Sequence, residues 1–93
     1  MNTIQEIESM DNARATALFE NLAIAYMGTE RWKLPLAREI GFGNDTIHRW
    51  LSDEGRPPVL VIRWLQCEIE LRRLHKAAAD VTRGLGAFSN VGP

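Results

Sequence analysis

The sequence has a single cysteine, no long apolar run and no strand-like alternation of apolar and polar residues. One cysteine, Cys67, excludes an intrachain disulfide and a cysteine-rich zinc site. No apolar run approaches the ~20 residues that a membrane-spanning helix needs. Residues 1–9 are acidic and lack the basic start and apolar centre of a signal peptide. We therefore expect no membrane association and a helical protein of the reducing cytoplasm.

Motifs of enzymes are also lacking. The chain has no glycine-rich phosphate loop, no nucleophile motif and no spacing of metal ligands. His48 has no serine or cysteine partner placed to use it as a catalytic base, and with His75 it makes too few ligands for a metal site. The sequence predicts no enzyme, no cofactor and no metal, and it points to no small-molecule ligand.

The residues that are present favour one small domain. Ninety-three residues, of which 45% are hydrophobic, suffice for a core without disulfide or metal staples. Residues 1–10 form either a short helix or a frayed end. Asp11 is a good N-cap for a helix that ends near Met27, before Gly28. Its apolar stripe is predicted to contain Ala15, Leu18, Phe19, Leu22, Ala25 and Tyr26.

The longest predicted helix runs from about Val59 to Arg83 and carries two apolar strips. One strip follows a heptad spacing through Leu60, Trp64, Cys67, Leu71, Leu74, Ala78 and Val81. The other contains Ile62, Leu65 and Ile69. One strip can serve the core of the domain and the other a partner, although the heptad can also pack within one subunit.

We predict a homodimer through residues 59–82, with an interface of Leu60, Trp64, Cys67, Leu71, Leu74 and Ala78. Cys67 is expected to be a buried small hydrophobe on this seam. The tryptophans Trp32, Trp50 and Trp64 are expected to anchor the core and the interface. The domain is predicted to span residues 1–83, and residues 84–93, which have no period, are expected to be a flexible tail.

Residues 33–52 hold the most specific pattern of the chain. They read as a short helix with Pro35 in its first turn, a stop at Gly41, and a second helix that Asn44 or Asp45 can cap. Ala37 supplies the small residue that two crossing helices require. The positions that clamp the helices together are apolar: Leu36, Ile40, Phe42, Ile47 and Trp50. This is the plan of a helix-turn-helix.

In Leu36-Ala37, Ile40-Gly41-Phe42, Ile47 and Trp50, residues 30–65 resemble the helix-turn-helix of Cro/C1-type repressors from phages and mobile elements. The resemblance implies a small all-α transcriptional regulator, here with the long C-terminal helix predicted above. It also implies a homodimer on a double-stranded DNA operator with two half-sites, in the cytoplasm of a bacterium and at its nucleoid, encoded by the bacterium or a phage.

If the second helix enters the major groove, its outward side chains read the bases. These are predicted to be Asn44, Asp45, His48, Arg49 and Ser52. Arginine contacts guanine and asparagine contacts adenine in bidentate fashion, whereas aspartate accepts from cytosine. Phosphate contacts position the protein without reading sequence, and they are predicted at Arg31, Lys33, Thr46 and Arg56.

The charge leaves a second hypothesis open. The chain has 11 basic and 12 acidic residues, and residues 1–29 alone carry a net charge of −3, against +1 for residues 30–63. Because phosphate neutralisation supplies much of the affinity for DNA, one subunit is expected to bind weakly. The acidic start also suits a protein-interaction module, such as an antiactivator, that uses the same helical fold without DNA.

Overall fold

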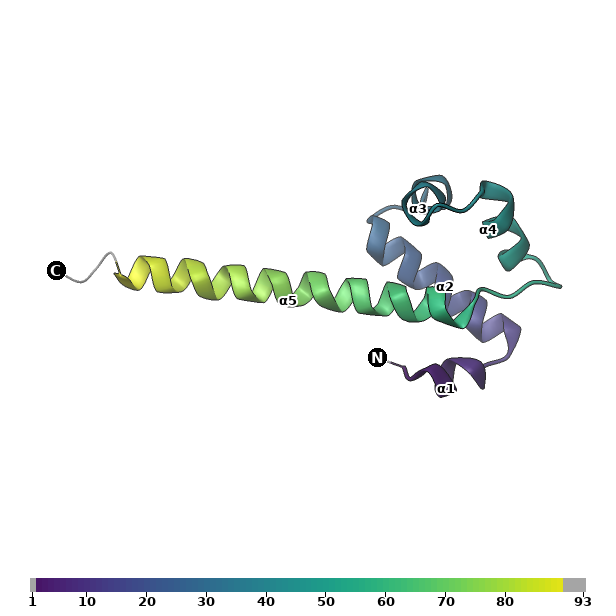
Figure 1. Cartoon of the computed structure of the whole chain (residues 1–93), viewed down its shortest axis with the longest axis horizontal. Helices are drawn as coiled ribbons and strands as arrows, with labels where there is room; N and C mark the ends of the chain where they lie inside the picture. Colours follow the sequence, from purple (N-terminus) through teal and green to yellow (C-terminus); the bar gives the residue numbers. More distant parts are fainter. Residues whose placement is uncertain (1, 90–93) are drawn as a thin grey trace.

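The computed structural model describes the backbone of residues 2–89 and the side chains of residues 2–86. The described residues form an all-α fold without a strand, as the sequence predicted (Figure 1). The helices are α1 (Ile4–Glu8), α2 (Asn12–Met27), α3 (Lys33–Ile40), α4 (Asn44–Leu51) and α5 (Val59–Ser89). Among the described helices, none combines the length and apolarity needed to cross a membrane.

The first two helices begin at side-chain caps. Thr3 and Glu6 form a capping box at α1, in which each side chain accepts from the backbone N–H of the other residue. The hydrogen bonds from Asn2 and from Thr3 hold the pKa of the Glu6 carboxyl below its usual value, with the Thr3 backbone as the largest cause. The first residues thus include a short helix. Asp11 caps α2 by accepting from the Arg14 N–H at 2.8 Å, and Gly28 ends it, as predicted.

α2 lies at the centre of the core. Its buried face consists of Ala15, Phe19, Ala23 and Tyr26, so the predicted stripe was wrong at Ala25, which is exposed. Phe19 meets the Trp32 ring edge to face at 5.3 Å and the Trp50 ring at 5.8 Å. Two of the three tryptophans therefore gather on one phenylalanine, and this contact ties the loop before α3 and the end of α4 to α2.

α5 divides into a packed part and a projecting part. Ile62 and Leu65 are buried against α2, and Ile69 packs beside them, so of the two predicted apolar strips this one serves the core. Every residue from Leu71 to Gly86 is exposed. The chain measures 66 × 28 × 19 Å and has a radius of gyration of 17.7 Å, against about 12 Å for a compact chain of this length. Figure 1 shows the reason, since α5 runs far beyond the other helices.

Two predictions for this helix were wrong. α5 continues through Gly84 and Gly86 to Ser89, past the predicted end near Arg83, so residues 84–89 of the predicted tail lie in this helix. The rest of that predicted tail, residues 90–93, lies outside the described residues. Cys67 is exposed rather than buried within the chain, since it lies about 140° around α5 from the buried Ile62. The Arg63 guanidinium donates to its Sγ at 3.4 Å.

Candidate nucleic-acid interface

α3 and α4 are joined by a turn of three residues. Gly41 has a φ of 79°, a left-handed conformation that glycine adopts without steric cost. The N–H groups of Gly41 and Phe42 both donate to the Ala37 carbonyl, which closes the end of α3. The N-cap of α4 is Gly43, which has no side chain to cap it, so the assignment of the cap to Asn44 or Asp45 was wrong. Both residues lie inside the helix.

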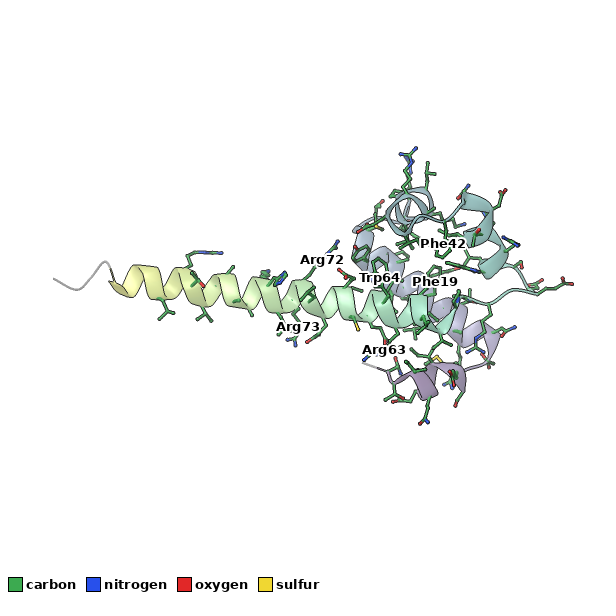
Figure 2. All side chains as sticks on the ribbon, viewed as in Figure 1. Phe19, Phe42, Arg63, Trp64, Arg72 and Arg73 are labelled. Atoms are coloured by element: carbon green, nitrogen blue, oxygen red, sulfur yellow. The ribbon has the colours of Figure 1, made fainter. Side chains whose placement is uncertain are left out.

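Buried apolar residues fix α4 against the rest of the domain. Leu36, Ala37 and Ile47 are buried, as their clamp positions predicted. Trp50 is half-buried, and Phe42 packs against its ring edge to face at 5.4 Å while remaining 45% exposed. The turn therefore carries an aromatic ring at the surface, next to α4 (Figure 2).

The opposite face of α4 is polar and exposed. Asn44, Asp45, His48 and Arg49 all lie on the surface, and their spacing of one turn puts them along one side of the helix. The Arg49 guanidinium donates to the Thr46 hydroxyl at 3.5 Å, which leaves it nearly free. The helix dipole favours an acidic residue in the first turn, such as Asp45, and basic residues in the last turn, such as His48 and Arg49. These residues can therefore also stabilise α4 itself.

Ser52, the remaining predicted base-reading residue, lies at the end of α4 and makes a hydrogen bond within the helix. The Ser52 hydroxyl donates to the Arg49 carbonyl at 2.7 Å and so closes the last turn. A Cβ on Gly55 would lie 1.7 Å from the same Arg49 oxygen, so only glycine lets the loop pass this close. Ser52 is exposed, but its hydroxyl serves the helix end rather than projecting freely.

Basic side chains around α3 and α4 are divided between the surface and the fold. Arg31 and Lys33 are exposed at the start of α3, as phosphate contacts require, and Thr46 is half-buried. Arg38, which sequence reasoning did not select, is also exposed on α3, one turn after Leu34. A lone arginine on an eight-residue helix carries no pattern that would have distinguished it.

Arg56 does not fit the predicted role of a phosphate contact. Its guanidinium donates to the Met10 carbonyl at 2.7 Å and to the Ile7 carbonyl at 2.6 Å. These carbonyls lie at and just beyond the end of α1, where a helix leaves acceptors without partners. Arg56 therefore ties the loop after α4 to the end of α1.

Sequence reasoning also missed a polar cluster that joins three helices. The Tyr26 hydroxyl donates to Glu39 of α3, and the Arg72 guanidinium of α5 lies 3.9 Å from the Tyr26 ring centroid while donating to the Tyr26 carbonyl at 2.5 Å. Burial, followed by the bond to Glu39, raises the pKa of the Tyr26 hydroxyl above its usual value. Tyr26 is separated in the chain from Glu39 by 13 positions and from Arg72 by 46, so no local motif links the three residues. Figure 2 places Arg72 where α5 leaves the domain.

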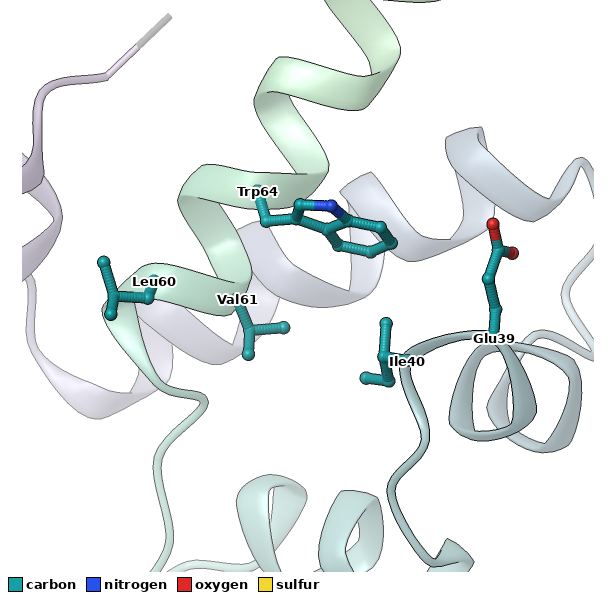
Figure 3. Close-up of a pocket in the computed structure, with 5 residues that line it drawn as sticks. All are labelled: Glu39, Ile40, Leu60, Val61 and Trp64. Carbon is teal, nitrogen blue, oxygen red and sulfur yellow. The ribbon is translucent and has the colours of Figure 1, made fainter.

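A shallow cavity of about 390 Å³ opens between the end of α3 and the start of α5. Glu39, Ile40, Leu60, Val61 and Trp64 line it (Figure 3). Leu60 is 71% exposed, and Trp64 is half-buried against the Tyr26 ring at 5.4 Å. Two predicted interface residues thus form an apolar wall beside α3. In the described part of the chain no three His, Cys, Asp or Glu side chains group as a metal site would require.

Compared with protein-family models, with curated proteins and with solved structures, the chain has no match. The fold alone therefore describes the class of the protein. It is an all-α domain in which a short helix with an exposed polar face, α4, lies at one end and an apolar-striped helix, α5, projects from the other (Figure 1).

Proposed function

We propose that the chain is a sequence-specific double-stranded DNA-binding transcriptional regulator, a repressor that acts as a homodimer on an operator with two half-sites. The observation that carries this proposal is the division of α4. Ile47 is buried, whereas Asn44, Asp45, His48 and Arg49 are exposed along the other side. A short helix held from behind, with hydrogen-bonding side chains in front, suits the major groove.

Three of the four exposed side chains of α4 have a specific base contact in this proposal, and His48 lies beside them on the same exposed face. Arg49 contacts a guanine, Asn44 an adenine, and Asp45 accepts from a cytosine. Arg31 and Lys33 hold the phosphates on one flank of α4, and Arg38 joins them. Ser52 and Arg56 drop out of the contact set because both are engaged within the fold.

The homodimer forms through α5. One copy has few free bases around α4, so two copies are needed to add the affinity of two half-sites. Repression follows from occupying the operator and blocking polymerase, in the cytoplasm of a bacterium, by a protein of bacterial or phage origin.

The experiment is a mobility shift and footprint on the DNA upstream of the gene. Arg49→Ala and Asn44→Ala should each reduce specific affinity by about 1–3 kcal/mol, the value of a good bidentate contact. Arg14→Ala is the matched control, because Arg14 is an exposed base on α2. If both α4 variants bind as well as the unchanged protein, α4 is not the reading helix.

A second function, a protein-interaction module such as an antiactivator, is favoured by the net charge of −3 on residues 1–29. It predicts no measurable DNA binding at low salt and stable capture of one defined helical partner. Alanine variants of α4 would then leave that capture unchanged. The same mobility shift at low salt separates the two functions.

A further inference from the structure

From Cys67 onward the seam of α5 lies on the side of the helix opposite the buried strip, whereas Trp64 near its start packs against the Tyr26 ring of α2. Each residue of an α-helix advances by about 100°, so Leu71, nine residues after the buried Ile62, lies about 180° from it. Leu71, Leu74 and Val81 are 45%, 53% and 62% exposed, and Ala78 is exposed between them. A partner helix can therefore lie along this seam without meeting α1 or α2 of the same chain.

The charge of α5 changes along its length. Residues 59–71 carry one base and two acids, a net charge of −1, whereas residues 72–83 carry four bases and one acid, a net charge of +3. Two parallel copies would place the basic halves side by side. Two antiparallel copies place each basic half beside the acidic half of its partner, and they also oppose the two helix dipoles.

We propose that a second copy of the chain packs antiparallel along this seam, with Cys67 facing Ala78 of the other copy. This inference rests on the proposed function, for which it specifies the partner's geometry. In this register Trp64 faces Val81 and Leu71 faces Leu74 of the other copy, so the largest residue meets a small one. The register shifted by one heptad sets Val81 opposite residue 57, which lies before the start of α5, and so leaves Val81 uncovered.

The antiparallel register also sets the distance between the two copies of the α3 end along the pair. Val61 flanks the seam on the side of α3, because it lines the cavity with Glu39 and Ile40 (Figure 3). In an antiparallel pair, flanking positions of the same kind lie on the same face of the dimer. The two copies of Val61 are separated by 23 residues along the pair, or about 35 Å at a rise of 1.5 Å. Successive major grooves on one side of DNA are ~34 Å apart.

Disulfide trapping of full-length chains tests the orientation. One chain is unchanged and carries only Cys67, and the other carries Cys67→Ala and Ala78→Cys with a larger tag. Mixed and mildly oxidised, they should link to each other. Each chain alone should stay unlinked, because its two equivalent cysteines lie 11 residues, about 16 Å, apart along the pair, beyond the ~7 Å that a disulfide spans.

The control chain carries Cys67→Ala and Lys76→Cys, since Lys76 lies on the same exposed part of α5 but away from the seam. It should not link to the unchanged chain. Efficient linking of each chain to its own copies would overturn the proposal in favour of parallel pairing. A monomer in sedimentation at tens of micromolar, with no linked species, would overturn it outright.

The linked heterodimer is then used in the mobility shift. If it forms but shifts no DNA at low salt, the pairing stands and the proposed function fails. If no linked heterodimer forms but the unchanged protein binds DNA specifically, the antiparallel pairing fails and the proposed function stands. The two results are therefore independent.

Discussion

Replacing Arg56 by alanine should weaken the fold rather than the contact with DNA. The Arg56 guanidinium makes hydrogen bonds of 2.7 and 2.6 Å to the Met10 and Ile7 carbonyls and is partly buried. A hydrogen bond to a charged group contributes about 1.5–3 kcal/mol. Since one side chain makes both bonds and solvent reaches it, we expect Arg56→Ala to lower the free energy of unfolding by about 2–3 kcal/mol.

The loss should be concentrated at α1. Ile7 is buried under α5 and depends on α1 staying in place. The amides of Ser9 and Met10, which donate to the Gln5 and Ile7 carbonyls, should exchange faster in the variant than the amides of α2. Hydrogen exchange followed by NMR resolves the two helices.

Urea unfolding at one fixed protein concentration is the assay for the total, because association would otherwise change the apparent stability. Arg31→Ala, at an exposed base, is the control and should change stability by less than ~0.5 kcal/mol. If Arg56→Ala keeps full stability but weakens DNA binding with a reduced salt dependence, Arg56 is a phosphate contact after all. The link to α1 would then play no part in solution.

Three further changes test other parts of the fold. Phe19→Ala empties the centre of the core and should lower the free energy of unfolding by about 3–5 kcal/mol. The control Leu34→Ala, at a half-exposed residue, should lower it by less than ~1 kcal/mol. Equal losses in urea unfolding would contradict the packing. Gly43→Ser gives α4 a side-chain cap and should raise the free energy of unfolding by about 0.5–1 kcal/mol. Gly41→Ala, at a φ of 79°, should lower it by about 1–2 kcal/mol. Thermal melts with the opposite order of stability would refute both expectations. The raised pKa of Tyr26 means that the folded state keeps its proton while the unfolded chain loses it, so stability should fall as pH rises above about 10; a Tyr26→Phe variant should lose that part of the slope, and an unchanged slope would exclude Tyr26 as its source.

The sequence was most informative where one residue type has one structural use. Asp11 could be assigned as a cap and Gly28 and Gly41 as helix ends, because caps and positive φ angles admit few residue types. The spacing of Ile62, Leu65 and Ile69 marked one of two apolar strips on α5, and the structure shows that this strip serves the core. These local rules were enough to predict the helices and the all-α class.

The candidate site was harder to predict because exposure and engagement depend on distant parts of the chain. Arg56 looks like any basic residue beside a DNA-binding motif, and only the fold brings it to α1, 46 residues away. Tyr26, Glu39 and Arg72 meet for the same reason. Cys67 follows the heptad pattern, but periodicity alone does not say which face of a helix the domain covers.

α5 is one helix in its geometry but two in its local stability. Up to Ile69 its hydrogen bonds are shielded by α1 and α2, so their opening requires unfolding of the domain. Beyond Arg72, whose guanidinium contacts Tyr26, the side chains are exposed as far as Gly86, and Gly84 and Gly86 each weaken the helix by about 1 kcal/mol relative to alanine. A helical segment of that length is marginal in water by itself. Protease cleavage after Arg83 or Lys76 should therefore be rapid in dilute protein and slow at high concentration, which makes the proteolytic lifetime of the projecting half a direct readout of whether it is covered.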